Sequence, residues 1–335
     1  MRRLPSPVIS IGNITAGGTG KTPAVIALAK LLHGHSEWGQ ISNLSPQSSQ
    51  EHIRRIAILT RGYKRRSQSP ILFVSDGSKI IASPQEAGDE PYLIASALNR
   101  TPVVVGADRY SAGRYAIDFF HTQLFILDDG YQHIKLHRDI NILLVDATNP
   151  FGNGQLLPGG ILREPLSEIS RADCIIINRA NEGDKEYVEG IARSYNRDSP
   201  IFYASYKITD VIDLNGHTLG LDHIAEKRLL LFSGIGNPRS FRKTVENAGG
   251  RINGEMIFPD HHWYTEKDVE RILTEASKLA AEAILTTEKD AVRISGNNLL
   301  KSMGIDVLVL KIEMDIGKEL GKWILEQIGR QAWGK

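Results

Sequence analysis

The sequence predicts an α/β protein: a parallel sheet with helices on both faces, followed by a second, smaller α/β domain. Short apolar runs of the kind that buried parallel strands show alternate along the chain with helical patterns. A glycine-rich turn joins the first apolar run to the first helical pattern. In such sheets ligands bind beyond the carboxyl ends of the strands, so the residues just after each apolar run are the first candidates for function.

The elements of the first domain follow one another in chain order. The polar stretch 33–52 has no apolar period and predicts an extended surface loop. The runs 70–74 and 80–81 flank an Asp-Gly turn and predict a hairpin. The remaining patterns predict strands at 8–11, 56–59, 103–105, 124–127, 140–145 and 175–177, and helices at 24–32, 86–98, 109–119 and 185–195.

The alternation changes near Pro200, and we place the domain boundary there. We therefore expect one α/β domain at 1–200 and a second α/β domain at 201–335. The C-terminal patterns predict extended stretches at 201–205 and 210–219, strands at 229–232, 252–258, 284–285 and 307–310, and helices at 238–248, 265–281 and 317–328.

Composition excludes several classes of protein. The 335 residues carry 40 Lys and Arg against 39 Asp and Glu, and this net charge of +1 gives no steering toward nucleic acid. The single cysteine, Cys174, lies in an apolar run, which excludes an internal disulfide and points to the cytoplasm. No window approaches the roughly 18 apolar residues of a membrane span, and we find no signal peptide.

The glycine-rich turn has the composition of a loop that binds a triphosphate. Backbone N–H groups without Cβ obstruction can converge on phosphate oxygens at a helix N-terminus. Lys21 is then expected to reach the β and γ phosphates, and the Thr22 hydroxyl to ligate Mg²⁺. The predicted ATP-binding residues are Thr15, Ala16, Gly17, Gly18, Thr19, Gly20, Lys21 and Thr22.

The match to the phosphate-loop pattern is not strict. Thr15 occupies the position of the first glycine, although Gly17 and Gly18 compensate. The loop is similar to the variant loop of dimeric switch ATPases, which carry a lysine where this chain has Ala16. A turn that only lets a helix pack close to a strand would explain neither Lys21 nor Thr22.

Two adjacent acids follow the apolar run 124–127. A phosphate-loop enzyme needs an oxygen ligand for Mg²⁺ at such a strand end, and Asp128 is the first choice and Asp129 the second. The alternative is a capped turn, since Asp-Gly is common after strands. Two neighbouring carboxylates repel each other unless a cation or a basic group lies between them, which favours the functional interpretation.

A further acid and a guanidinium follow the run 103–105. Asp108 could accept the proton of an attacking hydroxyl, and Arg109 could pair with phosphate oxygens. Asp108 could equally be the N-cap of the following helix, and spacing alone leaves both interpretations open.

Three later stretches are also candidates. The loop 153–165 ends in Arg163 and Glu164, and loops held by a rigid sheet often contact ligands. His261 and His262 are adjacent and point to opposite sides of an extended chain, so we expect no two-histidine metal site. One of them could act as an acid, a base or a phosphate donor, and the alternative is a surface histidine without a role. Lys289 could face an anion, but its spacing from Asp290 does not fit the guanine-reading motif and disfavours a GTPase.

Taken together, these stretches resemble one family over nearly the whole chain: tetraacyldisaccharide 4'-kinase, which phosphorylates the disaccharide lipid precursor of lipid A. The resemblance lies in motifs that occur in one order: Gly12-Asn13, Gly17 to Pro23, Thr60-Arg61-Gly62-Tyr63, Gly88-Asp89-Glu90-Pro91, Gly106 to Arg109, Asp128 to His133, Leu162-Arg163-Glu164-Pro165, Asp260-His261-His262 and Thr286 to Asp290.

The resemblance implies an ATP-dependent kinase with two α/β domains joined by a short two-stranded linker. The domain at 1–200 is then the ATP-binding kinase domain, and the C-terminal domain at 201–335 closes the active-site cleft. It implies that Asp108 is the catalytic base, helped by His261 or His262. It places Asp128 and Asp129 on the Mg²⁺ side and aligns Arg163 and Glu164 with residues near the phosphates and the metal. The expected catalytic residues are therefore Asp108, His261, His262, Lys21 and Arg163, and the expected metal ligands are Thr22, Asp128, Asp129 and Glu164.

The chain departs from the family at one end. Family members usually begin with a hydrophobic helix that anchors them to the inner membrane, and here seven residues precede Val8. We therefore expect either a shortened chain or peripheral contact with the cytoplasmic face of the inner membrane. The stretch 33–52 resembles an insertion. The expected partner is the acylated glucosamine disaccharide 1-phosphate, the expected cofactors are ATP and Mg²⁺, and we expect a monomer.

The expected reaction is in-line transfer of the γ-phosphoryl group to the 4'-hydroxyl of the lipid, with Asp108 receiving its proton. Two alternatives remain at this point. A dimeric, membrane-associated switch ATPase would modify no lipid, and a small-molecule kinase of the phosphate-loop class would need no amphiphile.

Overall fold

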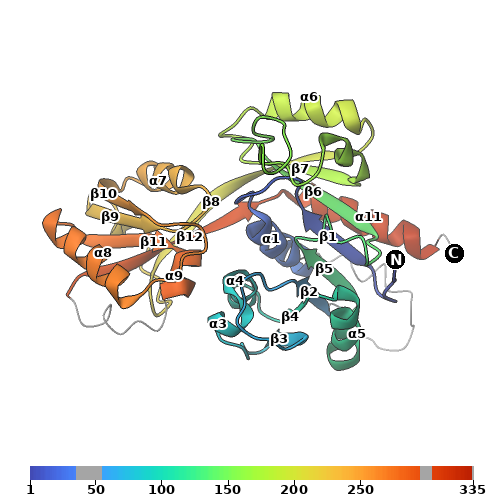
Figure 1. Ribbon diagram of the computed structural model, residues 1–335, viewed down its shortest axis with the longest axis horizontal. Coiled ribbons are helices and arrows are strands. Elements are labelled where there is room, and N and C mark those ends of the chain that lie inside the picture. The colour runs from blue at the N-terminus through green and yellow to red at the C-terminus, as the bar shows by residue number, and fades with distance from the viewer. Residues whose placement is uncertain (35–54, 295–303, 334–335) are drawn as a thin grey trace. The chain divides into compact units, whose positions relative to one another are not determined.

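Figure 1 shows the computed structural model, which describes residues 1–34, 55–294 and 304–333. The predicted surface loop at 33–52 therefore lies outside the described residues from residue 35 onward. The chain divides into two compact units. The first comprises Met1–Ser205 together with Met314–Lys335, and the second comprises Tyr206–Glu313.

The first unit is built on a sheet with β1 near its centre. The strand order is β8-β7-β6-β1-β5-β2-β4-β3, and all neighbours in this order are parallel except the edge pair β3 and β4. The strands are β1 (Val8–Gly12), β2 (Ile56–Thr60), β3 (Ile71–Asp76), β4 (Pro102–Gly106), β5 (Leu124–Asp128), β6 (Ile140–Asp146), β7 (Cys174–Asn178) and β8 (Ile201–Asp213).

Helices cover both faces of this sheet. On one face α5 (Arg109–Phe120) packs Ala112 and Ala116 against Val8 and Phe125. Because side chains alternate along a strand, Ile9 and Ile11 point to the other face. On that face α1 (Lys21–Gly34) contacts β1 and β5. The central strands are buried throughout, which explains why they appear in the sequence as continuous apolar runs.

The pattern at 86–98 forms two helices rather than the single predicted one. They are α3 (Pro84–Ala87) and α4 (Asp89–Ala97), separated by Gly88. Gly88 has φ of +91°, and a Cβ there would lie 3.0 Å from the carbonyl oxygen of Tyr63. Glycine is therefore needed at this break. The unit also contains η1 (Leu166–Arg171) and α6 (Lys185–Tyr195).

The second unit has a sheet of order β10-β9-β11-β12-β8. The pairs β10/β9, β9/β11 and β11/β12 are parallel. Its elements are η2 (Leu221–His223), β9 (Arg228–Ser233), α7 (Pro238–Asn247), β10 (Arg251–Ile257), α8 (Glu266–Lys278), β11 (Ala283–Thr287), α9 (Glu288–Ile294) and β12 (Asp306–Asp315). The sequence did not predict α9, which begins directly after β11 without an intervening loop.

The last helix belongs to the first unit, which differs from the division at residue 200. The chain crosses between the units within the continuous strand β8 and returns along β12. Helix α11 (Lys318–Trp333) then contacts α1, buries Leu320 and Ile324, and places Trp323 6.0 Å from the ring of Phe202. An amphipathic pattern shows that a helix has an apolar face but not which core receives it.

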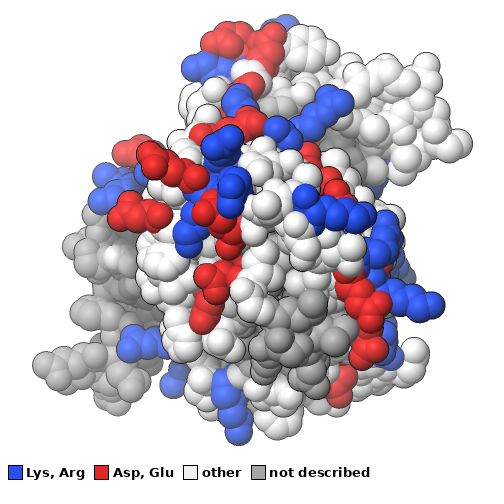
Figure 2. All heavy atoms as spheres, turned by 90° about the vertical axis from the view of Figure 1, so that its left-hand side faces the viewer, with Lys and Arg blue, Asp and Glu red and all other residues white. Residues whose placement is uncertain are grey.

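The charge distribution and the character of the helices agree with the composition. Figure 2 shows basic and acidic side chains interspersed on the viewed face, without a large region of one sign. Among the described residues, no helix is long and apolar enough to cross a membrane.

Candidate active site

The glycine-rich turn connects β1 to α1 as the sequence predicts. Gly17 and Gly20 have φ of +107° and +90°, conformations that L-residues rarely adopt. Helix α1 begins at Lys21, so the turn lies at the positive end of a 14-residue helix. The Thr22 side chain is buried beside it. This is the geometry of an anion site at a helix N-terminus.

Asn13 holds the turn in shape from within. Its amide nitrogen donates to the hydroxyls of Thr15 and Thr19 at 3.0 and 2.8 Å, and its amide oxygen accepts from Lys21 Nζ at 3.2 Å. At the other side of the turn, Asn178 donates to the carbonyl oxygen of Thr19 at 3.0 Å. Both asparagines are fully buried. Sequence reasoning assigned neither a role, although each follows an apolar run and Asn13 belongs to one of the motifs that carry the resemblance.

Asp129 and Arg163 form a two-point ion pair beside the turn. The guanidinium donates to the two carboxylate oxygens at 2.9 and 3.1 Å, and one of its nitrogens also contacts the side chain of Asn13. Lys21 Nζ lies 3.7 Å from the same carboxylate. Burial opposes ionisation of Asp129, but Lys21 and Arg163 hold its pKa below the ordinary value. The structure thus brings Lys21, Asp129 and Arg163 together.

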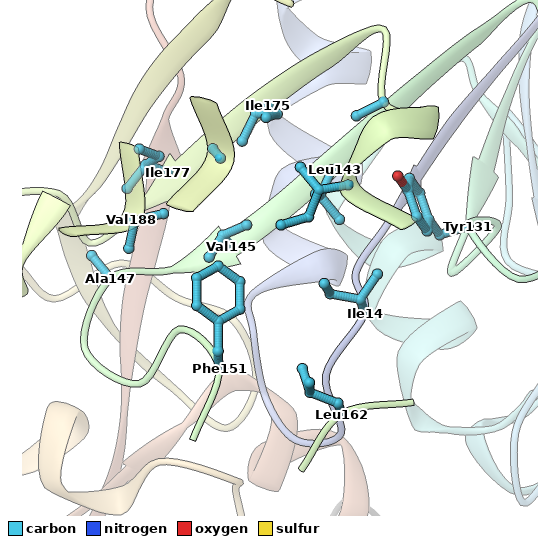
Figure 3. Close-up of a cluster of buried hydrophobic side chains, with 13 residues drawn as sticks. Ile14, Tyr131, Leu143, Val145, Ala147, Phe151, Leu162, Ile175, Ile177 and Val188 are labelled. Atoms are coloured by element: carbon cyan, nitrogen blue, oxygen red, sulfur yellow. The ribbon is translucent and has the colours of Figure 1, made fainter. Parts of the chain in front are cut away.

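An apolar cluster fixes these charged groups in place. Ile14, Tyr131 and Leu162 pack in one buried cluster with side chains of β6 and β7 (Figure 3). Each of them is within two residues of a polar site residue. The Arg163 backbone N–H also donates to the Ile14 carbonyl at 2.7 Å. A Cβ on Gly12 would lie 2.7 Å from Tyr131 Cβ, so a larger residue would separate β1 from the acidic turn.

Asp128 is the buried acid of the site. The parallel register places it beside Ile11, immediately before the turn. It accepts a hydrogen bond from the Thr60 hydroxyl at 2.9 Å, and burial, with the charges of Glu90 and Asp129, raises its pKa to about 7. Sequence reasoning quoted Glu90 within a motif without giving it a role.

The expected metal ligands do not all come together. The Glu164 carboxylate accepts from Arg171 at 2.8 Å and from Gln132 at 2.6 Å, so it serves an ion pair rather than a metal cluster. In the parts of the chain that the structure describes, no group of three or more His, Cys, Asp or Glu could hold a metal ion. Mg²⁺ usually needs only one or two protein carboxylates plus phosphate oxygens and water, and Asp128 with Thr22 fits that smaller set.

Asp108 is the N-cap of α5, the structural alternative that the sequence left open. It accepts from the backbone N–H groups of Tyr110 and Ser111, and Arg2 donates to it at 2.5 Å. The hydrogen bond from Arg2 lowers its pKa to about 2, although burial acts in the opposite direction. The Asp108 side chain remains 44% exposed, so a ligand can still reach its carboxylate while it caps the helix.

Arg109 is less accessible than a phosphate-binding residue would be. Its guanidinium is buried and donates to the carbonyl oxygens of Gly106 and Ala107, both at 3.2 Å. Its charge acts on both Asp128 and Asp129. Arg109 therefore supports the strand end and balances the two acids from inside the unit.

The two histidines of the second unit have different surroundings. His262 Nε2 lies 3.0 Å from Asp268, and its ring stacks on Phe258 at 5.0 Å. His261 Nδ1 lies 3.3 Å from the buried guanidinium of Arg293. Lys289, which the sequence offered as an anion contact, lies in the first turn of α9.

A parallel sheet with a glycine-rich turn, a lysine at the helix start and an acid on the neighbouring strand defines the P-loop class of nucleotide-binding proteins. The model of one family, tetraacyldisaccharide-1-P 4'-kinase, matches residues 1–329. The chain belongs to the tetraacyldisaccharide 4'-kinase family and is a kinase of lipid A biosynthesis. The expectation from the motifs is confirmed.

Named relatives agree with this assignment. The chain is 40% identical over 324 residues to the tetraacyldisaccharide 4'-kinase of Syntrophus aciditrophicus, covering 94% of this chain and 81% of the relative. It is 37% identical over 326 residues to that of Halothermothrix orenii, covering 92% and 80%. A crystal structure of LpxK from Aquifex aeolicus in complex with ATP matches with a TM-score of 0.72 and 34% identity, covering 98% of this chain and 90% of that one.

Proposed function

We propose that Lys21, Arg163 and the glycine-rich turn bind the triphosphate of ATP and that the γ-phosphoryl group passes to the 4'-hydroxyl of tetraacyldisaccharide 1-phosphate. The observation that supports this most is the joint contact of Lys21 and Arg163 with Asp129 beside the turn, which gathers two cations at the position for phosphates. The crystal structure of the Aquifex relative is a complex with ATP. Two fixed cations can neutralise charge on the transferring group.

The transfer is a single displacement at the γ-phosphorus. The 4'-oxygen forms a bond to the γ-phosphorus while the bond between that phosphorus and the β–γ bridging oxygen breaks, and ADP leaves. The hydroxyl proton goes to Asp108, which is ionised at neutral pH because its pKa is about 2. A carboxylate of such low pKa is a weak proton acceptor, so its first contribution is to orient the hydroxyl. One of His261 and His262 supports it.

Thr22 and Asp128 would hold Mg²⁺, which supplies positive charge to the β and γ phosphates when it is bound. Three observations favour this assignment: the hydroxyl and the carboxylate are both oxygen ligands, β5 neighbours β1, and burial, together with the charges of Glu90 and Asp129, raises the pKa of Asp128. Asp129 has its charge balanced by Arg163 and Lys21 and orients these cations instead.

The loop that carries Arg163 also offers a surface for acyl chains. Leu156 and Leu157 are 48% and 54% exposed. The loop is nevertheless ordered by its own hydrogen bonds, including Leu157 N–H to the Leu162 carbonyl at 2.8 Å, and Ala16 N–H of the turn donates to Ile161 at 2.7 Å. An amphiphilic acceptor has to bring its chains near the phosphates, and this loop presents apolar side chains there. Such a substrate also favours peripheral contact with the inner membrane.

Transfer of label from γ-labelled ATP to the tetraacyl disaccharide 1-phosphate in detergent micelles tests the proposal. We expect labelled lipid with the unaltered chain and none with Lys21→Ala. Lys278→Ala is the matched control, because Lys278 lies on α8, is largely exposed and pairs with Glu275 three residues earlier. ATP hydrolysis without labelled lipid would instead favour the switch ATPase, and transfer to a soluble sugar alone would favour the small-molecule kinase.

A further inference from the structure

One side chain, that of Asn13, joins the two parts of the candidate phosphate site. Its amide nitrogen donates to the glycine-rich turn, to the Thr15 carbonyl at 2.8 Å and to the Thr19 hydroxyl at 2.8 Å. Its amide oxygen accepts from Lys21 Nζ at 3.2 Å and from the guanidinium of Arg163. The residue is fully buried. Asn13 therefore fixes the backbone of the turn and two cations relative to one another.

The partners of this amide determine its orientation. Lysine and arginine side chains have donors and no acceptor, so the atom that faces them must be the amide oxygen. The Thr15 carbonyl is an acceptor only, so the atom that faces it must be the amide nitrogen. Both ends of the amide thus give the same assignment, because a flipped amide would place its donors against two other donors.

The charges around Asn13 include one more cation than ionised acid. Lys21 Nζ and the Arg163 guanidinium lie 3.7 and 2.9 Å from the Asp129 carboxylate, so two cations share one acid there. The Lys21 and Arg163 side chains are only 17% and 25% exposed, and charges shielded from water interact more strongly than charges in bulk solvent. Because Asn13 is neutral, one positive charge remains for an anionic ligand.

An aspartate at this position would keep the shape of the side chain but not the balance of charge. It would face the Thr15 carbonyl without a donor. It would also hold Lys21 and Arg163 through charge-assisted hydrogen bonds, and it would cancel the remaining positive charge. The site already disfavours further negative charge, because burial, together with the neighbouring acids, raises the pKa of Asp128 to about 7.

We propose that Asn13 is a positioning residue that aims Lys21 and Arg163 at the triphosphate without cancelling their charge, and that this neutral acceptor sets the preference for ATP over ADP. The γ-phosphate brings the additional negative charge that the two cations meet. The inference rests on the proposed function for the identity of the nucleotide. Nucleotide binding is measured without lipid, however, and is therefore separate from phosphoryl transfer.

Calorimetric titration of the full chain with ATP and with ADP, in the presence of Mg²⁺ and without lipid, tests the inference. Asn13→Asp should raise Kd for ATP at least about tenfold and Kd for ADP no more than about threefold, because the added charge repels the more negative nucleotide more strongly. Asn215→Asp is the matched control, since it adds the same charge at an exposed turn of the second unit, and neither Kd should change. Unchanged ATP binding by Asn13→Asp would overturn the inference.

Asn178→Ser separates the effect of charge from the effect of turn shape. Asn178 supports the same turn from its other side by donating to the Thr19 carbonyl at 3.0 Å. Loosening the turn should weaken binding of ATP and ADP by the same factor, because both nucleotides use the backbone donors of the turn. If Asn13→Asp also weakens both by the same factor, Asn13 only shapes the turn and the inference fails.

A double variant that moves the acid, rather than adding one, is a rescue experiment. Asn13→Asp combined with Asp129→Asn keeps one carboxylate and one amide beside the same two cations. We expect the ratio of the ADP Kd to the ATP Kd to return to within about threefold of the unaltered chain, so the effects of the two substitutions are not additive. A ratio as low as that of Asn13→Asp alone would overturn the inference.

The midpoint of thermal unfolding shows which variants are folded. If Asn13→Asp alone is unfolded, the double variant still decides, because it carries the substitution at position 13 with the balance of charge restored. Failure of the proposed function gives a different result. If the unaltered chain prefers ATP and depends on position 13 as expected but labels no lipid, the proposed transfer fails and the inference stands. An unaltered chain that binds ATP and ADP equally well would overturn the inference, whatever the lipid labelling.

Discussion

Arg163 contacts both carboxylate oxygens of Asp129, 34 residues earlier in the chain, at 2.9 and 3.1 Å. The same guanidinium contacts Asn13, so one side chain connects the acidic turn after β5 to the residue that begins the phosphate loop. A planar fork with several donors can make these contacts together, whereas a lysine is a single point charge.

Arg163→Lys should therefore lower kcat by at least about tenfold and weaken ATP binding, because the charge remains while the two-point contact is lost. Steady-state kinetics at varied ATP measures both effects. Arg242→Lys is the control, since Arg242 pairs with Glu246 on the exposed side of α7. Unchanged kinetics for Arg163→Lys would mean that only positive charge is needed at this position.

Asp108→Asn should show whether Asp108 contributes to phosphoryl transfer in addition to capping α5. Asparagine caps helices about as well as aspartate, so the midpoint of thermal unfolding should change little while kcat falls by about 10²-fold or more. Asp184→Asn is the matched control, because Asp184 caps α6 in the same unit. If both variants keep full turnover, Asp108 is a cap and nothing else.

Asp128→Asn should stabilise the protein while abolishing transfer. The Asp128 carboxyl ionises near pH 3.8 when unfolded and near pH 7 when folded, so the folded state disfavours its charge. This cost is absent below about pH 4, grows between pH 4 and 7 and is complete above pH 7. At pH 8 without metal or nucleotide, we expect a gain of about 1–3 kcal/mol, given about 1.4 kcal/mol per pKa unit.

Denaturant unfolding at pH 8 and pH 4 checks this sign. The gain should disappear at the lower pH, and Asp118→Asn on the exposed side of α5 should show no gain at either. A destabilised Asp128→Asn at pH 8 would mean that the ionised carboxylate is favourable in the folded chain.

Leu156→Ser combined with Leu157→Ser should raise KM for the tetraacyl substrate by about 5- to 10-fold, since each leucine can bury only the half of its surface that is exposed. KM for ATP should not change. Leu221→Ser in the second unit, where Leu221 is 39% exposed, is the control. If the variant instead binds vesicles less well but keeps its KM in micelles, these leucines contact the bilayer rather than the acyl chains.

The sequence predicts most of the fold because its central strands are buried on both faces and stand out as apolar runs. It also predicts Lys21, Thr22 and Asp128, since a phosphate loop and a strand-end acid have local patterns. Asn13 and Glu90 were missed because their importance comes from contacts and charges of residues distant in sequence. A local pattern cannot show these.

Glu164 is a second example of what a local sequence pattern cannot show. The resemblance to the family aligned it with residues near the phosphates and the metal, and this predicted a metal ligand. In the structure, Glu164 forms an ion pair with Arg171. The guanidinium of Arg171 also lies over the ring of Tyr131, 4.6 Å from its centroid. Only the fold decides which of several cations a carboxylate meets.

The return of the chain along β12 makes the histidine-bearing unit an insert within the nucleotide-binding one. Residues 206–313 form one unbroken segment, whereas the unit around the phosphate loop is completed by residues from both sides of that segment. Shortening the protein from its carboxyl end would therefore first remove a helix that packs against α1, so nucleotide binding would be damaged while Arg293 and His261 remained intact.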